Sequence, residues 1–361
     1  MVKMGRRSNQ SVLRSLLTRI EDDESDFTYQ GREKKEIDWT KYDTAQINEI
    51  NDMLEYIRDS VDQAVRKLNI EERYEQEKKK PGQPMVFPGD LAKAVLLQQY
   101  FSVANRVSEG LVLLFMEKMG ITESFSYKTI ERAYDNLFVQ EILHHLFIAT
   151  QQPVKEKEKN FSTDGTGAPT SMKYNYEHEK HGKKKGEERK LDMFEQLILT
   201  VGCQYQLITD FIMTDNPHAH ESPYLEEAVP RVASMYESIH IWSSDAGYIS
   251  RINTTAIADA GGIPRIYPKK DDTFKAKGSP AWKKMHYALI NDPQQWLREY
   301  HQRSISETVN STYLRMFPKP LARKVRGRRF YESFARTCVY NLKRLLYLRY
   351  LEDLKVDWDE A

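Results

Sequence analysis

Apolar and polar positions alternate with a helical period through the first part of the chain. Between positions 47 and 61 the apolar residues lie three or four positions apart, which places them on one face of a helix. A charged run follows at 71–80, and Pro81-Gly82-Gln83-Pro84 then interrupts the pattern. The pattern predicts a polar, helical region over residues 1–80 and a boundary near residue 81.

Three further helices are predicted between residues 81 and 155. Asp90 is a good N-cap for a buried helix at 91–101, and apolar residues between 107 and 115 form the face of a second helix. Ser126 is the expected cap of the third helix, whose inward face contains Ile130, Ala133, Tyr134 and Leu137. We therefore expect a separate small helical domain at 81–155.

The start of the third helix carries polar residues that point away from its apolar face. They are Lys128, Thr129 and Arg132. A helix-turn-helix has this arrangement, in which the N-terminal residues of its last helix enter the major groove of DNA. Because many small helical bundles share the pattern, DNA contact by these residues is a hypothesis.

The apolar period changes from helical to extended after Asn160. Short strands are predicted at 161–164, 197–201, 207–212, 239–245 and 263–267, with the second and third forming a hairpin around Gly202. Helices are expected at 224–235, 254–260, 296–317 and 331–354. This order predicts an α/β domain at 156–361, a mixed sheet with flanking helices, preceded by an all-helical N-terminal region.

Composition narrows the setting of the protein. The chain has 361 residues, a formal net charge of +1 and two cysteines, Cys203 and Cys338, both in apolar surroundings. No stretch approaches the ~18 apolar residues of a membrane span, and the first residues lack the apolar segment of a signal peptide. We therefore expect a cytoplasmic protein with reduced thiols.

The near-zero net charge hides two basic clusters, at 180–190 and at 315–329. The second cluster contains no acidic residue. Because unopposed cationic side chains repel one another unless a polyanion is present, we predict that this stretch contacts phosphate. Its members Arg315, Arg326, Arg328 and Arg329 are the expected DNA contacts.

Two aspartates stand where chemistry often gathers in an α/β sheet. Asp164 and Asp245 each follow an expected strand and precede a turn that contains glycine. Such a turn exposes the carboxylate at the edge of the sheet, and the small residue lets a ligand approach. Taken one at a time, each aspartate is better explained as an ordinary turn or cap residue.

Three segments together resemble a known family. They are 161–167, which contains Asp164-Gly165-Thr166-Gly167, 239–248, and 300–307 with the pattern Tyr-x-x-Arg-x-x-x-Glu. The ordered set resembles the catalytic core of DDE transposases from prokaryotic insertion sequences, and the third segment resembles the signature of the insertion-sequence-four group. The resemblance implies a ribonuclease H-like fold and covers about half of the chain, roughly residues 155–345.

The resemblance also implies the chemistry of the site. Asp164, Asp245 and Glu307 would hold two Mg²⁺ ions, with Mn²⁺ as a substitute, for cleavage and transfer of DNA strands at the ends of an insertion sequence. Carboxylates suit such hard cations. Tyr300 and Arg303 share a helical face with Glu307, so Arg303 is positioned to grip a phosphate. The family pattern then continues with six residues and a lysine, where this chain has Leu314 beside Arg315.

The expected partner is double-stranded DNA, at the element ends and at the target, and a homodimer is expected because two ends must be joined. Two alternatives remain open: a structure-specific nuclease on the same scaffold, and a DNA-binding regulator derived from a transposase. Trp282 and Trp296 lie between Asp245 and Glu307. We interpret them as core residues of a compact helical connection with at most a short strand.

Overall fold

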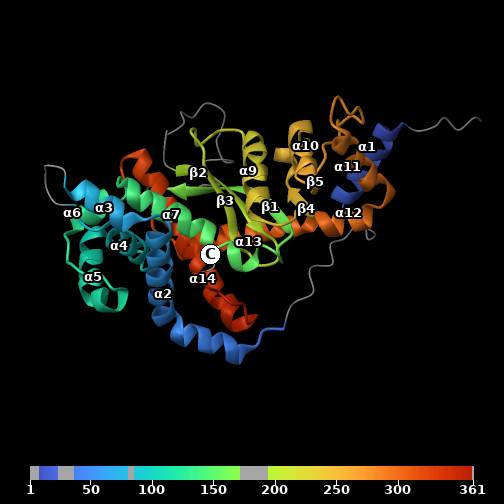
Figure 1. The fold of residues 1–361 in the computed structure, drawn as a ribbon. Helices are drawn as coiled ribbons and strands as arrows, with labels where there is room; N and C mark the ends of the chain where they lie inside the picture. The colour runs from blue at the N-terminus through green and yellow to red at the C-terminus, as the bar shows by residue number, and fades with distance from the viewer. Residues whose placement is uncertain (1–7, 23–35, 80–84, 171–193, 360–361) are drawn as a thin grey trace, which may run out of the picture.

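The computed structural model describes residues 8–22, 36–79, 85–170 and 194–359. The predicted boundary at 81–84 and the basic cluster at 180–190 therefore lie outside the described residues. Among those described, no helix combines the length and apolar character needed to cross a lipid bilayer. The molecule is elongated, with α3 to α6 at one end, the sheet near the middle, and α1, α11 and α12 at the other end (Figure 1).

The described N-terminal part is helical, as predicted. Helix α1 packs on α11, at the end of the molecule that lies away from α3 to α6. Helix α2 packs on α4, α7 and the last helix of the chain. The element bounds are α1 (Asn9–Glu21), α2 (Trp39–Lys67), α3 (Ile70–Lys78), α4 (Pro88–Tyr100), α5 (Asn105–Met119), α6 (Tyr127–Ala133) and α7 (Leu137–Ala149).

Three details of this part differ from the prediction. Helix α4 begins at Pro88, so Asp90 lies inside its first turn and accepts hydrogen bonds from the backbone N–H and hydroxyl of Thr122, at 3.1 Å each. Val107 and Leu114 of the expected second apolar face are more than half exposed. Helix α6 ends at Ala133, because the chain then turns and Asn136 caps a new helix, α7, which the sequence pattern did not separate.

The sheet has the mixed organisation expected. Strands β1, β2 and β3 are antiparallel neighbours, and β4 and β5 continue the sheet from β1 in parallel, giving the order β3-β2-β1-β4-β5. The bounds are β1 (Asn160–Pro169), β2 (Phe194–Gly202), β3 (Ile208–Met213), β4 (Ile241–Ser244) and β5 (Ile263–Ile266). The predicted end of the first strand at Asp164 is wrong, because β1 remains paired with β2 through Pro169.

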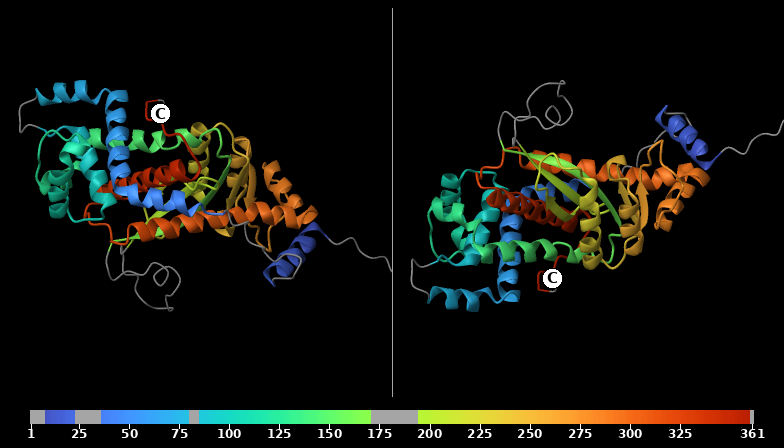
Figure 2. Two further views of the ribbon diagram at one scale, coloured as in Figure 1. Left: turned by 90° about the horizontal axis from the view of Figure 1, so that it is seen from below. Right: turned by 90° about the horizontal axis from the view of Figure 1, so that it is seen from above.

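Helices cover both faces of the sheet (Figure 2). Phe161 contacts Tyr236 at the end of α9, and Asp210 of β3 bonds to Arg231 of α9, so α9 covers this face. The next side chain along each of these strands points to the other face of the sheet. There Ser162 contacts Ser306 of α13, and Phe211 contacts Phe330 of α14. The bounds are α9 (Ser222–Met235), α10 (Arg251–Asp259), α11 (Pro280–Asn291), α12 (Pro293–Tyr300), α13 (Ser304–Met316) and α14 (Arg326–Leu351).

The helical connection between Asp245 and Glu307 is confirmed. It contains α10, the four-residue strand β5, α11 and α12. Trp282 and Trp296 are buried, with 3% and 1% of their surface exposed, which confirms them as core residues. The expected helix at 296–317 is interrupted by a 3₁₀ turn at His301–Arg303, so α12 and α13 are separate helices.

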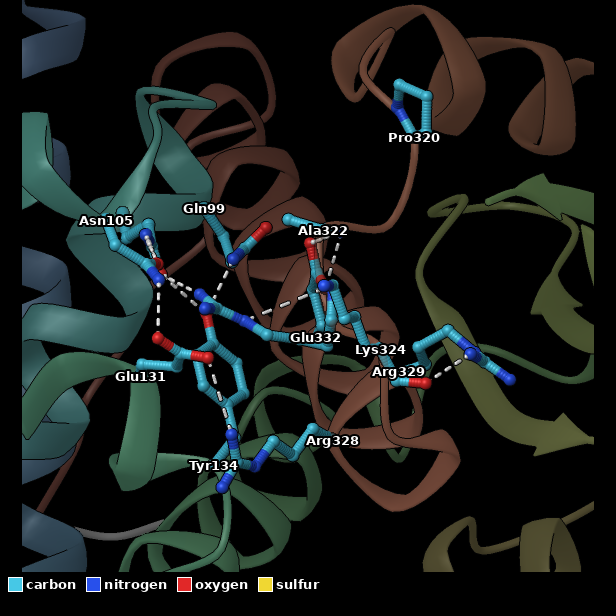
Figure 3. Close-up of polar contacts among 12 residues, drawn as sticks. Gln99, Asn105, Glu131, Tyr134, Pro320, Ala322, Lys324, Arg328, Arg329 and Glu332 are labelled. Carbon is cyan, nitrogen blue, oxygen red and sulfur yellow. Dashed lines mark hydrogen bonds and ion pairs between the residues drawn. The ribbon is translucent and has the colours of Figure 1, made fainter. Parts of the chain in front are cut away.

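Helix α14 connects the helical part to the sheet. It packs on α2, α4 and α7 and also on β3. A buried polar network joins its first turns to α4. Glu332 accepts a hydrogen bond from the backbone N–H of Ala322 (Figure 3). Glu332 also accepts from the backbone of Arg323 and from Arg336, and Arg336 donates to Gln99 of α4. Glu332 is 2% exposed, so the network is shielded from water.

We expect Glu332→Ala to lower the free energy of unfolding by about 3–5 kcal/mol, because it leaves Arg323 and Arg336 buried without their carboxylate. Urea denaturation of the full chain measures the change. Asp359→Ala is the control: Asp359 pairs with Arg66 on the surface, and its loss should change stability by less than about 1 kcal/mol. Equal small effects of both substitutions would show that the network does not stabilise the fold.

Candidate active site

The register of two parallel strands places Asp164 beside Asp245. Strand β1 pairs with β4 through Thr163 opposite Ser244, where β4 ends. Asp164 and Asp245 are the next residue of each chain segment, and adjacent strands lie about 4.8 Å apart. The two carboxylates therefore occupy neighbouring positions, which is what their strand contexts predicted, although β1 itself continues beyond Asp164.

Helix α13 brings the third carboxylate to the same face of β1. The hydroxyl of Ser162 donates to that of Ser306 at 3.1 Å, and Nδ2 of Asn310 donates to Oδ2 of Asp164 at 3.2 Å. Ser162 and Asp164 share a face because side chains alternate along a strand. Glu307 follows Ser306 directly on this helix and lies within electrostatic reach of Asp164.

Electrostatic interactions connect the three carboxylates. Burial raises the pKa of Asp164 to about 7; Arg303 opposes this rise, while Asp245, Glu221 and Glu307 add to it. The pKa of Arg303 is raised by its neighbours Tyr300, Glu307, Asp164 and Asp245, although its burial acts in the opposite direction. Asp245 and Glu307 therefore each lie within electrostatic reach of Asp164 and of the Arg303 guanidinium.

The carboxylates do not form a closed cage in this structure. Glu307 is turned onto Arg303, with its Oε1 2.6 Å from Nη2, and Oδ1 of Asp245 accepts a hydrogen bond from the backbone N–H of Gly247 at 2.7 Å. Among the described residues, no three His, Cys, Asp or Glu side chains gather closely enough to hold a metal ion. Holding one would require Glu307 to turn from Arg303 toward the aspartates.

The aromatic ring of Tyr300 lies near the guanidinium of Arg303. Its ring stacks on Trp296 with centroids 5.3 Å apart, and the Arg303 guanidinium lies 5.9 Å from the centre of the Tyr300 ring. Tyr300 is 9% exposed, and burial raises the pKa of its hydroxyl to about 12. DNA contact by Tyr300 and Arg303 stays a prediction; in this structure the Tyr300 ring packs near the arginine.

A fourth carboxylate, Glu221, was not among the residues that the sequence predicted. It accepts hydrogen bonds from Nε2 of Gln196 and from the hydroxyl of Tyr248, both at 3.0 Å. A side chain at Gly165 would meet this carboxylate, since a Cβ placed there lies 2.5 Å from it. A glycine directly after Asp164 was the available signal, because it marks a close approach by another group.

The candidate recognition residues lie at the far end of the molecule. Lys128 and Arg132 are exposed and Thr129 is half-buried on α6, while Ile130 and Ala133 form its buried face. This arrangement agrees with the expected outward orientation of the polar positions. Their contact with DNA stays a prediction.

The basic stretch is not unopposed, contrary to our expectation. Arg326 and Arg329 both pair with Glu195, and Arg328 pairs with Asp135 and Glu131. These acids are distant in sequence, which is why the composition of the stretch did not reveal them. The charge argument for phosphate binding by the three arginines is therefore wrong, and these paired side chains are no longer expected to be the main phosphate contacts.

Arg315 has a different environment. It is exposed at the end of the unbroken helix α13, and its guanidinium bonds to the backbone of Ser311 and the hydroxyl of Thr312 in its own helix. Leu314, which stands at the lysine position of the family pattern, packs partly against the hydrophobic core. Near the lysine position of the family pattern, Arg315 is therefore a charged side chain that is exposed to solvent.

Comparison with known proteins agrees with the sequence resemblance at a coarse level. The chain is 25% identical over 338 residues to a protein of Archaeoglobus fulgidus named "Probable transposase for insertion sequence element ISA1214", covering 92% of this chain and 96% of that protein. This similarity over nearly the full length supports a transposase. No family model and no solved structure matches the chain.

The raised pKa of Asp164 predicts a pH-dependent stability. Because the folded protein binds the proton more tightly than the unfolded chain, this group's stabilising contribution is complete below 3.8, the ordinary pKa of an aspartate, and is lost as pH rises to about 7. In protein freed of divalent metal, Asp164→Asn should therefore raise the thermal midpoint relative to wild type at about pH 8.5 but not at about pH 4.

Thermal unfolding in the presence of a chelator measures this difference. Asp271→Asn, at an exposed aspartate, is the control and should leave the midpoint unchanged at both pH values. If Asp164→Asn instead lowers the thermal midpoint at the higher pH, then the folded protein stabilises the ionised carboxylate of Asp164.

Proposed function

We propose that the protein is a DDE transposase with a ribonuclease H-like catalytic domain, which cleaves and joins DNA strands at the ends of an insertion sequence. The observation that carries the proposal is the strand register that sets Asp164 beside Asp245, with Glu307 of α13 within electrostatic reach of Asp164. The full-length similarity to an insertion-sequence transposase supports the same conclusion, as does the mixed sheet with helices on both faces.

The donor atoms at the site fit hard divalent cations. Carboxylate oxygens dominate it, and the carboxamide oxygen of Asn310 is buried without a hydrogen-bond partner among the described residues. Asp164, Asp245 and Glu307 would hold two Mg²⁺ ions, or Mn²⁺ as a substitute. When bound, such a pair activates the attacking oxygen, stabilises the leaving oxygen and neutralises charge at the phosphate.

The protein's own side chains have definite parts in this chemistry. In cleavage, the oxygen of a water molecule forms a bond to phosphorus and gives up a proton. The bond between phosphorus and the 3′ oxygen breaks, and this oxygen takes up a proton and leaves as a 3′-hydroxyl. In transfer, the oxygen of that hydroxyl forms a bond to a phosphorus of the target strand and loses its proton, the bond between that phosphorus and the target's 3′ oxygen breaks, and this oxygen leaves as a 3′-hydroxyl. Turning Glu307 inward frees Arg303, whose planar donors suit a phosphate oxygen pair, while Tyr300 keeps the guanidinium in place.

We also propose double-stranded DNA as the partner, bound along the molecule by a homodimer that holds two ends. Lys128, Thr129 and Arg132 on α6 are the proposed base contacts, and Arg315 is the proposed backbone contact next to the catalytic face. Arg315 follows Glu307 by eight residues of continuous helix, a rise of about 12 Å. That distance lies within the width of a duplex.

A strand-joining assay separates transposition from the two alternatives. The substrate is DNA carrying the inverted repeats that flank the protein's own reading frame, incubated with Mg²⁺ and a supercoiled target plasmid. A transposase produces covalently joined end and target strands, a structure-specific nuclease produces cut strands alone, and a regulator produces neither. If cleavage is efficient but no joined products form, the proposal is overturned.

The three carboxylates should be individually required for cleavage. We expect Asp164→Ala, Asp245→Ala and Glu307→Ala each to lower the cleavage rate by about 10³-fold, because losing a ligand removes several kcal/mol of transition-state stabilisation. Binding of end DNA, measured by fluorescence anisotropy, should stay close to that of wild type. Glu72→Ala and Asp271→Ala, at exposed positions, are the matched controls. Retained cleavage in any of the three variants would remove that residue from the active site.

The salt dependence of DNA affinity should separate Arg315 from the paired arginines. Arg315→Ala should flatten the slope of log affinity against log salt by about 0.9, the value for one lost phosphate contact. Arg328→Ala is the comparison, and we expect a slope close to that of wild type because its guanidinium is held by Asp135 and Glu131. If Arg328→Ala flattens the slope and Arg315→Ala does not, the assignment of these contacts is reversed.

A further inference from the structure

The carboxamide of Asn310 has an unusual environment. Its Nδ2 donates to Oδ2 of Asp164 at 3.2 Å, and the residue is 6% exposed. Its Oδ1 has no hydrogen-bond partner in the described part of the chain. Leaving a buried acceptor unpaired costs about 1–3 kcal/mol, and native structures keep few such atoms. The two polar atoms share one carbon, so the unpaired oxygen also lies beside the Asp164 carboxylate.

Asn310 lies one helical turn beyond Glu307 on α13. It follows Glu307 by three positions, a spacing that places two side chains on one face of a helix. The preceding turn of this face is held on β1 by the bond between Ser306 and Ser162. Val309 and Ile305, on the neighbouring face, are buried. The helix is therefore fixed, and the carboxamide is presented to Asp164 by the backbone.

The charge around Asn310 favours a cation. Asp164 is surrounded by the carboxylates of Asp245, Glu221 and Glu307, with Arg303 acting in the opposite direction. Glu221 approaches so closely that Gly165 has no room for a side chain. Such a group of carboxylates is stabilised by a multiply charged ion, and a hard divalent ion accepts carboxamide oxygens together with carboxylates.

A packing role alone does not account for an asparagine at this position. Leucine has nearly the same shape, would fill the same volume and would leave no unpaired acceptor. A role limited to orienting Asp164 would use Nδ2 and leave Oδ1 without purpose. The unpaired oxygen and the surrounding negative charge both point to a positively charged ligand.

We propose that Asn310 is an additional metal-binding residue of the site, whose carboxamide oxygen binds the divalent cation held by Asp164 and Glu307. Its amide nitrogen fixes one oxygen of Asp164, which leaves the other oxygen for the ion. The neutral oxygen adds a ligand without adding negative charge to a site that already contains four carboxylates. This inference rests on the proposed function.

Mn²⁺ binding to the full chain in the absence of DNA tests the proposal, by electron paramagnetic resonance of the free ion and by titration calorimetry. Asn310→Leu should weaken binding at the Asp164-dependent site by about 10-fold or more. Asn310→Asp should retain binding, because it keeps an oxygen at the same place. In the absence of metal, Asn310→Leu removes both the unpaired oxygen and the donor to Asp164, so its thermal midpoint should stay close to that of wild type.

Asn341→Leu is the structural control. Asn341 is fully buried on α14 and bonds to the backbone of Ile208 and to Thr150. Its replacement should lower the thermal midpoint and leave Mn²⁺ affinity unchanged. A variant that merely loosens the fold would behave in this way, so the pair distinguishes a ligand from a structural residue.

Two outcomes would overturn the proposal, and they differ in what they say about the proposed function. If Asn310→Leu binds Mn²⁺ as wild type does while Asp164→Asn does not, the metal site stands and Asn310 is not part of it. If Asp164→Asn and wild type bind Mn²⁺ equally, the metal site itself fails, and with it the metal chemistry of the proposed function.

Discussion

The docking of α13 on β1 is the contact on which the candidate site depends. Two small hydroxyl side chains, Ser162 and Ser306, allow the helix to lie close to the strand and bond across the gap. One turn further along, Asn310 reaches Asp164. A larger residue at either serine would push the helix away and separate Glu307 from the aspartates. The geometry of three acidic groups distant in sequence thus follows from one closely packed helix–strand contact.

The fold was largely predictable because the apolar residues of its strands and helices recur at regular spacings. The hairpin of β2 and β3, the parallel strands β4 and β5 and the helical connection before Glu307 all follow from local patterns. The length of β1 was not predictable from Asp164-Gly165-Thr166-Gly167, since glycines usually end a strand. Here pairing with β2 carries the strand through them.

The candidate site was predictable in part. The strand-end contexts of Asp164 and Asp245 identified two neighbouring positions, and Glu307 lies within electrostatic reach of Asp164. Glu221 was hidden because a glutamate before a helix is common, and its importance arises from the approach to Gly165 across the sheet. The pairing of Arg326, Arg328 and Arg329 was hidden for the same reason, since their carboxylate partners come from other elements.

Helix α14 has a consequence for how this protein evolves. Its residues contribute to one hydrophobic core that extends from α2 and α4 to β3, and its first turns are joined to α4 by buried hydrogen bonds. The helical part and the sheet therefore do not behave as interchangeable modules. A recombination that exchanged the N-terminal helices between relatives would have to bring a compatible α14 from the other end of the gene. Changes in the DNA specificity that we propose for α6 should consequently accumulate as surface substitutions on that helix, not as exchanges of whole segments.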